Sequence, residues 1–219
     1  MKFDPQNPFP LLPLTDYAYH EAQAHAALVD DWLGFQCLEV ETQIRALPKN
    51  AGEHQNWEHL SLQAFQTPYC EIHNILDLLS LQPGQHIVDL GCAYARMAFV
   101  LQRHYPDCSF TGFELEALRV QEAQRVFFHH TGKNLSAQAQ DLSAAEFSPP
   151  LADIYFIFDF GNQRAVEKTL NDLKDLARRQ PITVVARGKL SRFCIHKDHP
   201  WLTSIEEPQH FSHFSIYRS

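Results

Sequence analysis

The sequence predicts an α/β protein built on a doubly wound, mostly parallel sheet, with a helical layer at its N-terminus. Short apolar runs at 85–90, 109–114, 153–160 and 181–187 have the length and composition of buried strands. Apolar residues at roughly helical spacing follow the first two runs. They are Met97, Val100 and Leu101 after the first run, and Leu118, Val120 and Val126 after the second.

The first strand ends in a tight turn of small residues, Asp89-Leu90-Gly91-Cys92-Ala93-Tyr94-Ala95-Arg96. Open α/β sheets bind nucleotide-like ligands at such a turn. The dinucleotide fingerprint G-x-G-x-x-G reads Gly91, Ala93 and Arg96 here, so its third glycine is missing. A carboxylate at Asp89 would also repel a pyrophosphate and attract a cation. These features disfavour a nicotinamide oxidoreductase and favour a cationic ligand.

Three further acidic residues stand at the ends of later strands. Glu114 closes the second strand, Asp141 follows the weakly marked run Gln138-Ala139-Gln140, and Asp159 ends the apolar run 153–158. An ionised carboxylate at the end of a buried strand is costly unless it meets a partner or a cleft. We therefore expect these side chains to face a common site.

The segment Val88–Arg96 resembles motif I of the class I S-adenosylmethionine-dependent methyltransferases, although Ala93 and Ala95 replace two family glycines. The resemblance extends over about residues 67–219. It implies a seven-stranded sheet whose last strand, near 211–217, is antiparallel, and S-adenosylmethionine as cofactor. It implies that Glu114 accepts the ribose hydroxyls and that Asp141 lies beside the adenine. The cofactor-binding residues expected on this basis are Thr67, Tyr69, Asp89, Gly91, Cys92, Ala93, Arg96, Glu114, Leu115, Asp141, Leu142 and Asp159.

A closer resemblance concerns the methyl acceptor. Thr67-Pro68-Tyr69, a helix, Pro83-Gly84 and the motif ending at Arg96 look like bacterial and mitochondrial protein-lysine methyltransferases. Those enzymes are related to the histone lysine methyltransferases named for disruption of telomeric silencing. Their pattern has aspartate where this chain has Tyr94. The resemblance implies a protein lysine amine as acceptor.

The acceptor side of the site is expected at Asp159-Phe160-Gly161-Asn162, where many N-methyltransferases carry D/N-P-P-Y/F. The first acid and an aromatic residue are present, but the two prolines are not. Asp159 and Phe160 are the expected catalytic residues, with Tyr69 closing over the sulfonium. The departure leaves the acceptor atom open between nitrogen, oxygen and carbon.

Two alternatives stay open at this point. A small-molecule methyltransferase is favoured if the N-terminal layer closes over the cleft. A cofactor-binding but inactive adaptor is suggested by Ala93 and Ala95, because alanine adopts positive φ less readily than glycine.

The expected organisation is an N-terminal helical extension over 1–66 and a methyltransferase domain over 67–219. Within the extension, Met1 to Pro13 is a proline-rich arm, and a helix begins near Thr15 and runs to about Leu47. Gly34 is a candidate break in that helix. A short amphipathic segment follows at Trp57 to Phe65.

Composition limits the remaining classes. The chain has 219 residues, 45% of them hydrophobic, and a net charge of −8, which argues against bulk electrostatic binding of nucleic acid. No apolar run approaches the ~20 residues needed to span a bilayer, and no secretory signal is visible. Five irregularly spaced cysteines suit reduced thiols in the cytoplasm, and no metal-binding spacing is found among the histidines.

Overall fold

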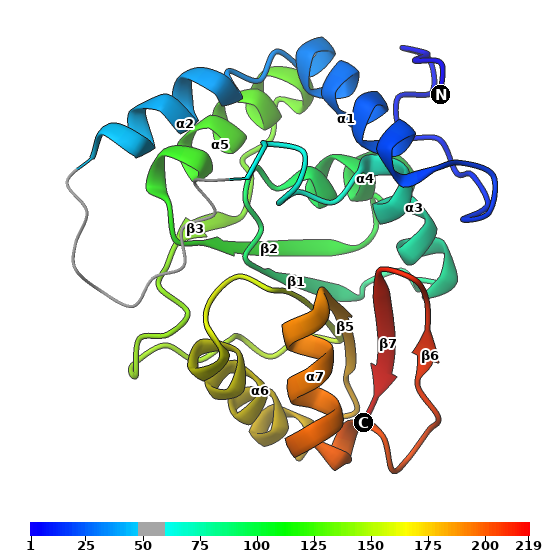
Figure 1. Cartoon of the computed structure of the whole chain (residues 1–219), viewed down its shortest axis with the longest axis vertical. Coiled ribbons are helices and arrows are strands. Elements are labelled where there is room, and N and C mark those ends of the chain that lie inside the picture. The colour runs from blue at the N-terminus through cyan, green and yellow to red at the C-terminus, as the bar shows by residue number, and fades with distance from the viewer. Residues whose placement is uncertain (48–59) are drawn as a thin grey trace.

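A computed structural model describes residues 1–47 and 60–219 (Figure 1). Its centre is a seven-stranded sheet with the strand order β3-β2-β1-β4-β5-β7-β6. The strands are β1 (His86–Leu90), β2 (Ser109–Glu114), β3 (Ala137–Ala139), β4 (Ile154–Phe158), β5 (Thr183–Arg187), β6 (Gln209–His210) and β7 (Phe214–Arg218). The structure thus confirms the predicted doubly wound sheet of seven strands.

The strand order reverses at β1, which places the carboxyl ends of β1, β2 and β4 at one edge of the sheet. β1 pairs in parallel with β2 on one side and with β4 on the other. β7 is antiparallel to β5, as expected for the last strand, and the two-residue β6 pairs with β7. The crevice outside the strand ends at such a reversal is where open α/β sheets bind ligands.

Side chains alternate between two apolar cores along each central strand, because successive residues of a strand point to opposite faces. Ile87, Phe156 and Val185 belong to the core on one face. Val88 and Tyr155 belong to the core on the other. Because both faces of the sheet are covered, its central strands contain near-continuous runs of apolar residues.

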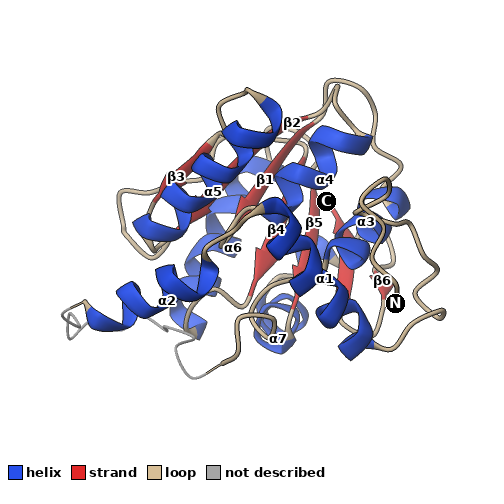
Figure 2. Ribbon diagram, turned by 90° about the horizontal axis from the view of Figure 1, so that it is seen from above, coloured by secondary structure: helices blue, strands red, loops and turns tan. Residues whose placement is uncertain are grey.

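Helices cover both faces of the sheet (Figures 1 and 2). α6 and α7 contribute to the core that contains Val88, and the earlier helices contribute to the core that contains Ile87. The helices are α1 (Tyr19–Leu33), α2 (Cys37–Ala46), α3 (Tyr69–Leu78), α4 (Arg96–His104), α5 (Ala117–Thr131), α6 (Gln163–Ala177) and α7 (Lys189–Asp198), with a 3-10 turn at Pro200–Leu202.

The N-terminal layer consists of two helices, because Gly34 ends α1 in the left-handed conformation (φ 78°). The helix predicted to run to Leu47 is therefore divided at the expected glycine. Val29 of α1 and Val40 of α2 share one apolar core with Ile87 of the sheet. The amphipathic segment predicted at 57–65 lies partly outside the described residues, and 62–65 consists of turns and a bend.

None of the helices formed by residues 1–47 and 60–219 combines the length and the apolar composition required to cross a membrane.

Candidate active site at the carboxyl ends of the strands

The turn after β1 has an unusual backbone that small residues make possible. Gly91, Ala93 and Ala95 have φ values of 93°, 48° and 53°. A Cβ on Gly91 would lie 2.7 Å from Cβ of Phe160, so only glycine fits there. Ala93 and Ala95 hold the left-handed conformation that glycine adopts easily, which stores strain at this turn. The left-handed turn is therefore formed with alanine at positions 93 and 95.

Three neighbouring cavities surround this turn, and Gly91 lines all of them. Their volumes are about 230, 370 and 20 Å³. The first lies between the ends of β2, β4 and β5 and the segment Leu60–Phe65. The second lies between Glu114, Asp141, Leu142 and the start of α6. The third is a small space beside Asp89, Cys92 and Thr67. Sites for small molecules are typically concave spaces with a few converging polar groups.

Glu114 is buried at the centre of this region and lines the two larger cavities. Its Oε2 accepts a hydrogen bond from the backbone N–H of Ala93 at 2.9 Å. Its Oε1 accepts from the N–H of Glu116 and from Nη1 of Arg119, both at 3.1 Å. Since a carboxylate offers about four acceptor positions, these bonds leave about one for a ligand.

Asp89 is the second buried acid of the site, with 3% of its surface exposed. Its Oδ1 finds no hydrogen-bond partner among the described residues. Burial, with a smaller contribution from the nearby charge of Glu114, raises the pKa of Asp89 to about 8. A buried polar atom without a partner is expensive, and this one borders a cavity at the strand ends.

Asp141 and Leu142 line the second cavity, as does Leu115, which follows Glu114. Oδ1 of Asp141 accepts hydrogen bonds from the N–H and the hydroxyl of Ser143. The bonds fix the loop after β3. Polar and apolar side chains thus lie together on this side of Glu114.

Asp159 and Phe160 line the first cavity, but the carboxylate of Asp159 has a second role. It accepts bonds from the backbone N–H groups of Leu190 and Ser191 and from the Ser191 hydroxyl, at 2.7–3.0 Å. It therefore caps α7, and it packs so closely on Gly188 that a Cβ there would lie 2.2 Å away. The expected acceptor-side carboxylate is thus engaged by a helix N-terminus, whose partial positive charge attracts it.

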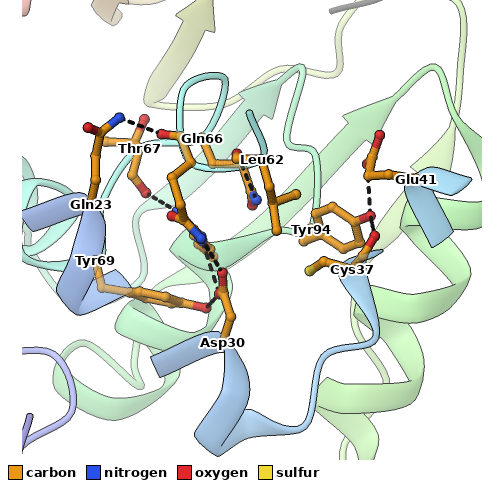
Figure 3. A network of polar contacts seen from close by, with 11 residues as sticks. Gln23, Asp30, Cys37, Glu41, Leu62, Gln66, Thr67, Tyr69 and Tyr94 are labelled. Carbon is orange, nitrogen blue, oxygen red and sulfur yellow. Dashed lines mark hydrogen bonds and ion pairs between the residues drawn. The ribbon is translucent and has the colours of Figure 1, made fainter. Parts of the chain in front are cut away.

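Tyr69 lies elsewhere than expected. It is fully buried, and its hydroxyl donates to Asp30 of α1 at 2.9 Å (Figure 3). Its ring stacks on Phe9 of the N-terminal arm. The ring contacts the guanidinium of Arg96 and lines none of the three cavities, so its position does not support the expectation that it closes over a sulfonium. Its position two residues after Thr67 in the sequence carried no information about the direction of the side chain.

Arg96 and Thr67 belong to the same buried network. The guanidinium of Arg96 forms an ion pair with Asp30 and donates to the Thr67 carbonyl at 3.2 Å. Arg96, Thr67, Cys92 and Asp89 all line the smallest cavity, and Ala93 also lines the first. Of the residues expected to bind cofactor, Tyr69 alone lines none of the three cavities.

Several residues of the site were not predicted. Arg119 and Arg187 line the first cavity together with Phe65 and Phe158. Arg187 pairs with Glu71 at 3.2 Å, so it is not available for the basic patch that its neighbours Lys189 and Arg192 suggest. Arg119 was detectable in principle, because it lies five residues after the acidic strand end Glu114, in the first turn of the following helix. Phe65 carries no local signal. No group of residues within the described parts of the chain has the composition of a metal site.

Comparison with known proteins gives a structural likeness only. No family model matches the sequence, and no curated protein does. A SAM-dependent methyltransferase from Aquifex aeolicus superposes with a TM-score of 0.50 at 10% identity, over 68% of this chain and 88% of that one. A putative O-methyltransferase from Nostoc punctiforme gives 0.52 at 10% identity, over 68% and 56%. TrmN from Thermus thermophilus gives 0.52 at 12% identity, over 72% and 50%.

These likenesses establish the architecture. The chain has the Rossmann-like fold of class I methyltransferases, with helices on both sides of a seven-stranded, mostly parallel sheet. At 10–12% identity the fold alone is shared, so the activity has to be argued from the site.

Proposed function

We propose that this protein is a methyltransferase that uses S-adenosylmethionine. The observation that carries the proposal is the unpartnered, buried Oδ1 of Asp89, held across the glycine turn from Glu114. Asp89 has an oxygen without a partner, and a cation would be a suitable one. Glu114 can accept one more hydrogen bond, such as one from a hydroxyl. A ligand with both an ammonium and a ribose matches this pair of acids.

The described residues suggest a place for each part of that cofactor. Glu114 would accept a ribose hydroxyl, Asp141 and Leu142 would lie on the adenine side, and Asp89 would face the ammonium. Thr67, Cys92, Ala93 and Leu115 border the same spaces. The cavity of about 370 Å³ supports the adenosine end of such a ligand, and the small space beside Asp89 adjoins it at Gly91.

The cofactor supplies an activated methyl on a sulfonium, so transfer asks the protein mainly for alignment. The first cavity would hold the acceptor, since it is bordered by Asp159 and Phe160 and adjoins Gly91. Asp159 is fixed by α7 and would orient an acceptor rather than swing toward it. Tyr69 supports the turn through Arg96 and is no part of this proposed acceptor pocket.

The N-terminal layer favours a small-molecule acceptor. Leu60, Ala64 and Phe65 form part of the wall of the first cavity, so the extension closes over one side of the cleft. A protein lysine amine is the second candidate. The rings of Phe65, Phe158 and Phe160 border this cavity, and aromatic faces attract an amine or its methylated cation. Five free cysteines support a reducing compartment such as the cytoplasm.

The test is methyl transfer to a cell lysate. The protein is incubated with S-adenosylmethionine tritiated on the methyl group, and the products are separated into small and macromolecular fractions. We expect tritium in the small-molecule fraction. Label on protein lysines would select the second candidate, and an absence of label despite bound cofactor would identify an adaptor.

A further inference from the structure

A buried chain of charges connects the N-terminal layer to the ribose side of the proposed site. Glu41 of α2, Arg119 of α5 and Glu114 of β2 are each less than 9% exposed. Nε and Nη2 of Arg119 donate to the two oxygens of Glu41 at 2.8 and 3.0 Å. Nη1 alone reaches Glu114, at 3.1 Å. The guanidinium of Arg119 thus makes two hydrogen bonds to Glu41 and one to Glu114.

Glu41 accepts a third hydrogen bond, and Arg119 has an aromatic neighbour. The hydroxyl of Tyr94, in the turn after β1, donates to its Oε1 at 2.8 Å (Figure 3). The ring of Phe65 lies 4.8 Å below the guanidinium of Arg119. Glu41 does not line any of the three cavities at the strand ends, whereas Arg119 and Glu114 both do. It can therefore act on a ligand only indirectly, through Arg119 or through Tyr94.

We infer that Glu41 is a positioning residue that keeps Arg119 from occupying the ribose acceptor, Glu114. A buried guanidinium needs carboxylate partners, and its planar fork matches a carboxylate best when both prongs engage. While Glu41 accepts two of the guanidinium's hydrogen bonds, the carboxylate of Glu114 keeps room to accept a bond from a ligand. Without the Glu41 carboxylate, Arg119 turns its fork onto Glu114 and competes with the ribose hydroxyls. The inference rests on the proposed function.

Glu122 offers a matched control for this role. Like Glu41 it is a buried acid that joins the N-terminal layer to α5, accepting from the N–H of Gln36 at 2.6 Å and pairing with Arg125 at 2.7 Å. Arg125 in turn donates to the carbonyl of Gly34. Glu122 borders none of the three cavities. Its removal loosens the same layer without touching Glu114.

The test is calorimetric titration of the full chain with S-adenosylhomocysteine. We expect Glu41→Gln to weaken binding at least about tenfold and Glu122→Gln to change it less than about twofold. The double variant Glu41→Gln/Arg119→Met should bind as tightly as the wild type or more tightly, since no cation is left to compete. This variant removes both members of the buried pair, an exchange that proteins tolerate better than the loss of one partner.

The outcomes separate the inference from its premise. If the wild type does not bind S-adenosylhomocysteine, the proposed function fails and the inference falls with it. If the wild type binds but Glu41→Gln matches Glu122→Gln, the inference alone is wrong. Weaker binding by the double variant than by the wild type would likewise overturn it, because the network would then be a scaffold that the ribose site requires. The double variant decides the question even where the single variant does not fold.

Discussion

At the residue scale, the surroundings of Asp89 link cofactor binding to pH. The pKa of this buried carboxyl rises from an ordinary value of 3.8 to about 8, mainly through burial. The ligand-free side chain is therefore mostly protonated at neutral pH. An ammonium group beside it favours the ionised form, so binding below pH 8 must release a proton.

We accordingly predict that affinity for S-adenosylhomocysteine rises between pH 6 and pH 8, by at most about tenfold per pH unit. Below pH 8, the heat of binding should differ between two buffers of unlike ionisation enthalpy, because the released proton is taken up by the buffer. Asp89→Asn should remove both dependences. Equal heats for the wild type in the two buffers would mean that Asp89 does not face the ligand.

The same shift fixes the sign of a stability effect. A carboxyl whose pKa is raised in the folded state stabilises the protein at acid pH, and this contribution is lost as pH rises from about 4 to about 8. Asp89→Asn should remove that loss, so the substitution should stabilise the ligand-free protein at pH 8. Aspartate at position 89 thus lowers the stability of the ligand-free protein, as is common for residues of functional sites.

The sequence largely predicted which residues line the site, but it did not predict the directions in which their side chains point. Acidic residues at strand ends indicated Asp89, Glu114, Asp141 and Asp159, and all four line the cavities. Tyr69 begins a helix whose first turn is buried on several sides. Nothing in its neighbours specified that the ring would turn toward Asp30.

At the element scale, the turn between β1 and α4 requires glycine at position 91 but accepts either alanine or glycine at position 93. Gly91→Ala adds a methyl 2.7 Å from Cβ of Phe160 at a φ of 93°, so it should cost more than about 2 kcal/mol. Ala93→Gly relieves a strained φ of 48° but loses a buried methyl and adds backbone entropy, so the net change should stay within about 1 kcal/mol. Urea unfolding measures both. Equal losses for the two variants would refute this description of the turn.

The start of α7 provides a second test at this scale. Asp159→Ala removes three hydrogen bonds that cap the helix and should lower the free energy of unfolding by about 1–2 kcal/mol. Asp175→Ala is the control, since this exposed acid on α6 pairs with Arg178 on the surface and its loss should cost less than about 0.5 kcal/mol. Unchanged stability of Asp159→Ala would show that its carboxylate serves the cavity and not α7.

Elements with a strong pattern were predictable, and elements set by tertiary contacts were not. The apolar runs gave β1, β2, β4 and β5 to within a few residues, and Gly34 indicated the break between α1 and α2. β6 has only two residues, both exposed, and exists because β7 lies beside it. The cap of α7 comes from Asp159, 30 residues before the helix begins, which no local signal reveals.

At the scale of the whole molecule, buried ion pairs fasten the N-terminal layer to the sheet. Asp30 of α1 pairs with Arg96 and accepts from Tyr69 and Gln63. Asp30→Asn leaves a buried guanidinium without its counter-charge and should cost about 3–5 kcal/mol. Its exposed neighbour supplies the control, since Asp31→Asn should stay within about 0.5 kcal/mol. A small effect at Asp30, measured by urea unfolding, would mean that the layer is held by its apolar core alone.

The organisation at this scale was only partly readable from sequence. The boundary expected near residue 66 is where the family resemblance begins, yet Phe9, Val29 and Val40 pack into the same core as Ile87. The charges that join the two parts lie 66 and 78 residues apart along the chain in the pairs Asp30–Arg96 and Glu41–Arg119. Ion pairs between residues so far apart depend on the fold, so no periodic pattern in the sequence indicates them.

The central claim is that Glu114 and Asp89 hold S-adenosylmethionine at the strand ends, and one titration tests it most directly. Calorimetry of the wild type and Glu114→Ala with S-adenosylhomocysteine should show binding that falls about 10- to 150-fold in the variant, since hydrogen bonds to a charged group contribute about 1.5–3 kcal/mol. NADH should give no heat with either protein. No binding by the wild type at about 1 mM ligand, where the free energy is only about −4 kcal/mol, or equal binding by the variant, would contradict the claim.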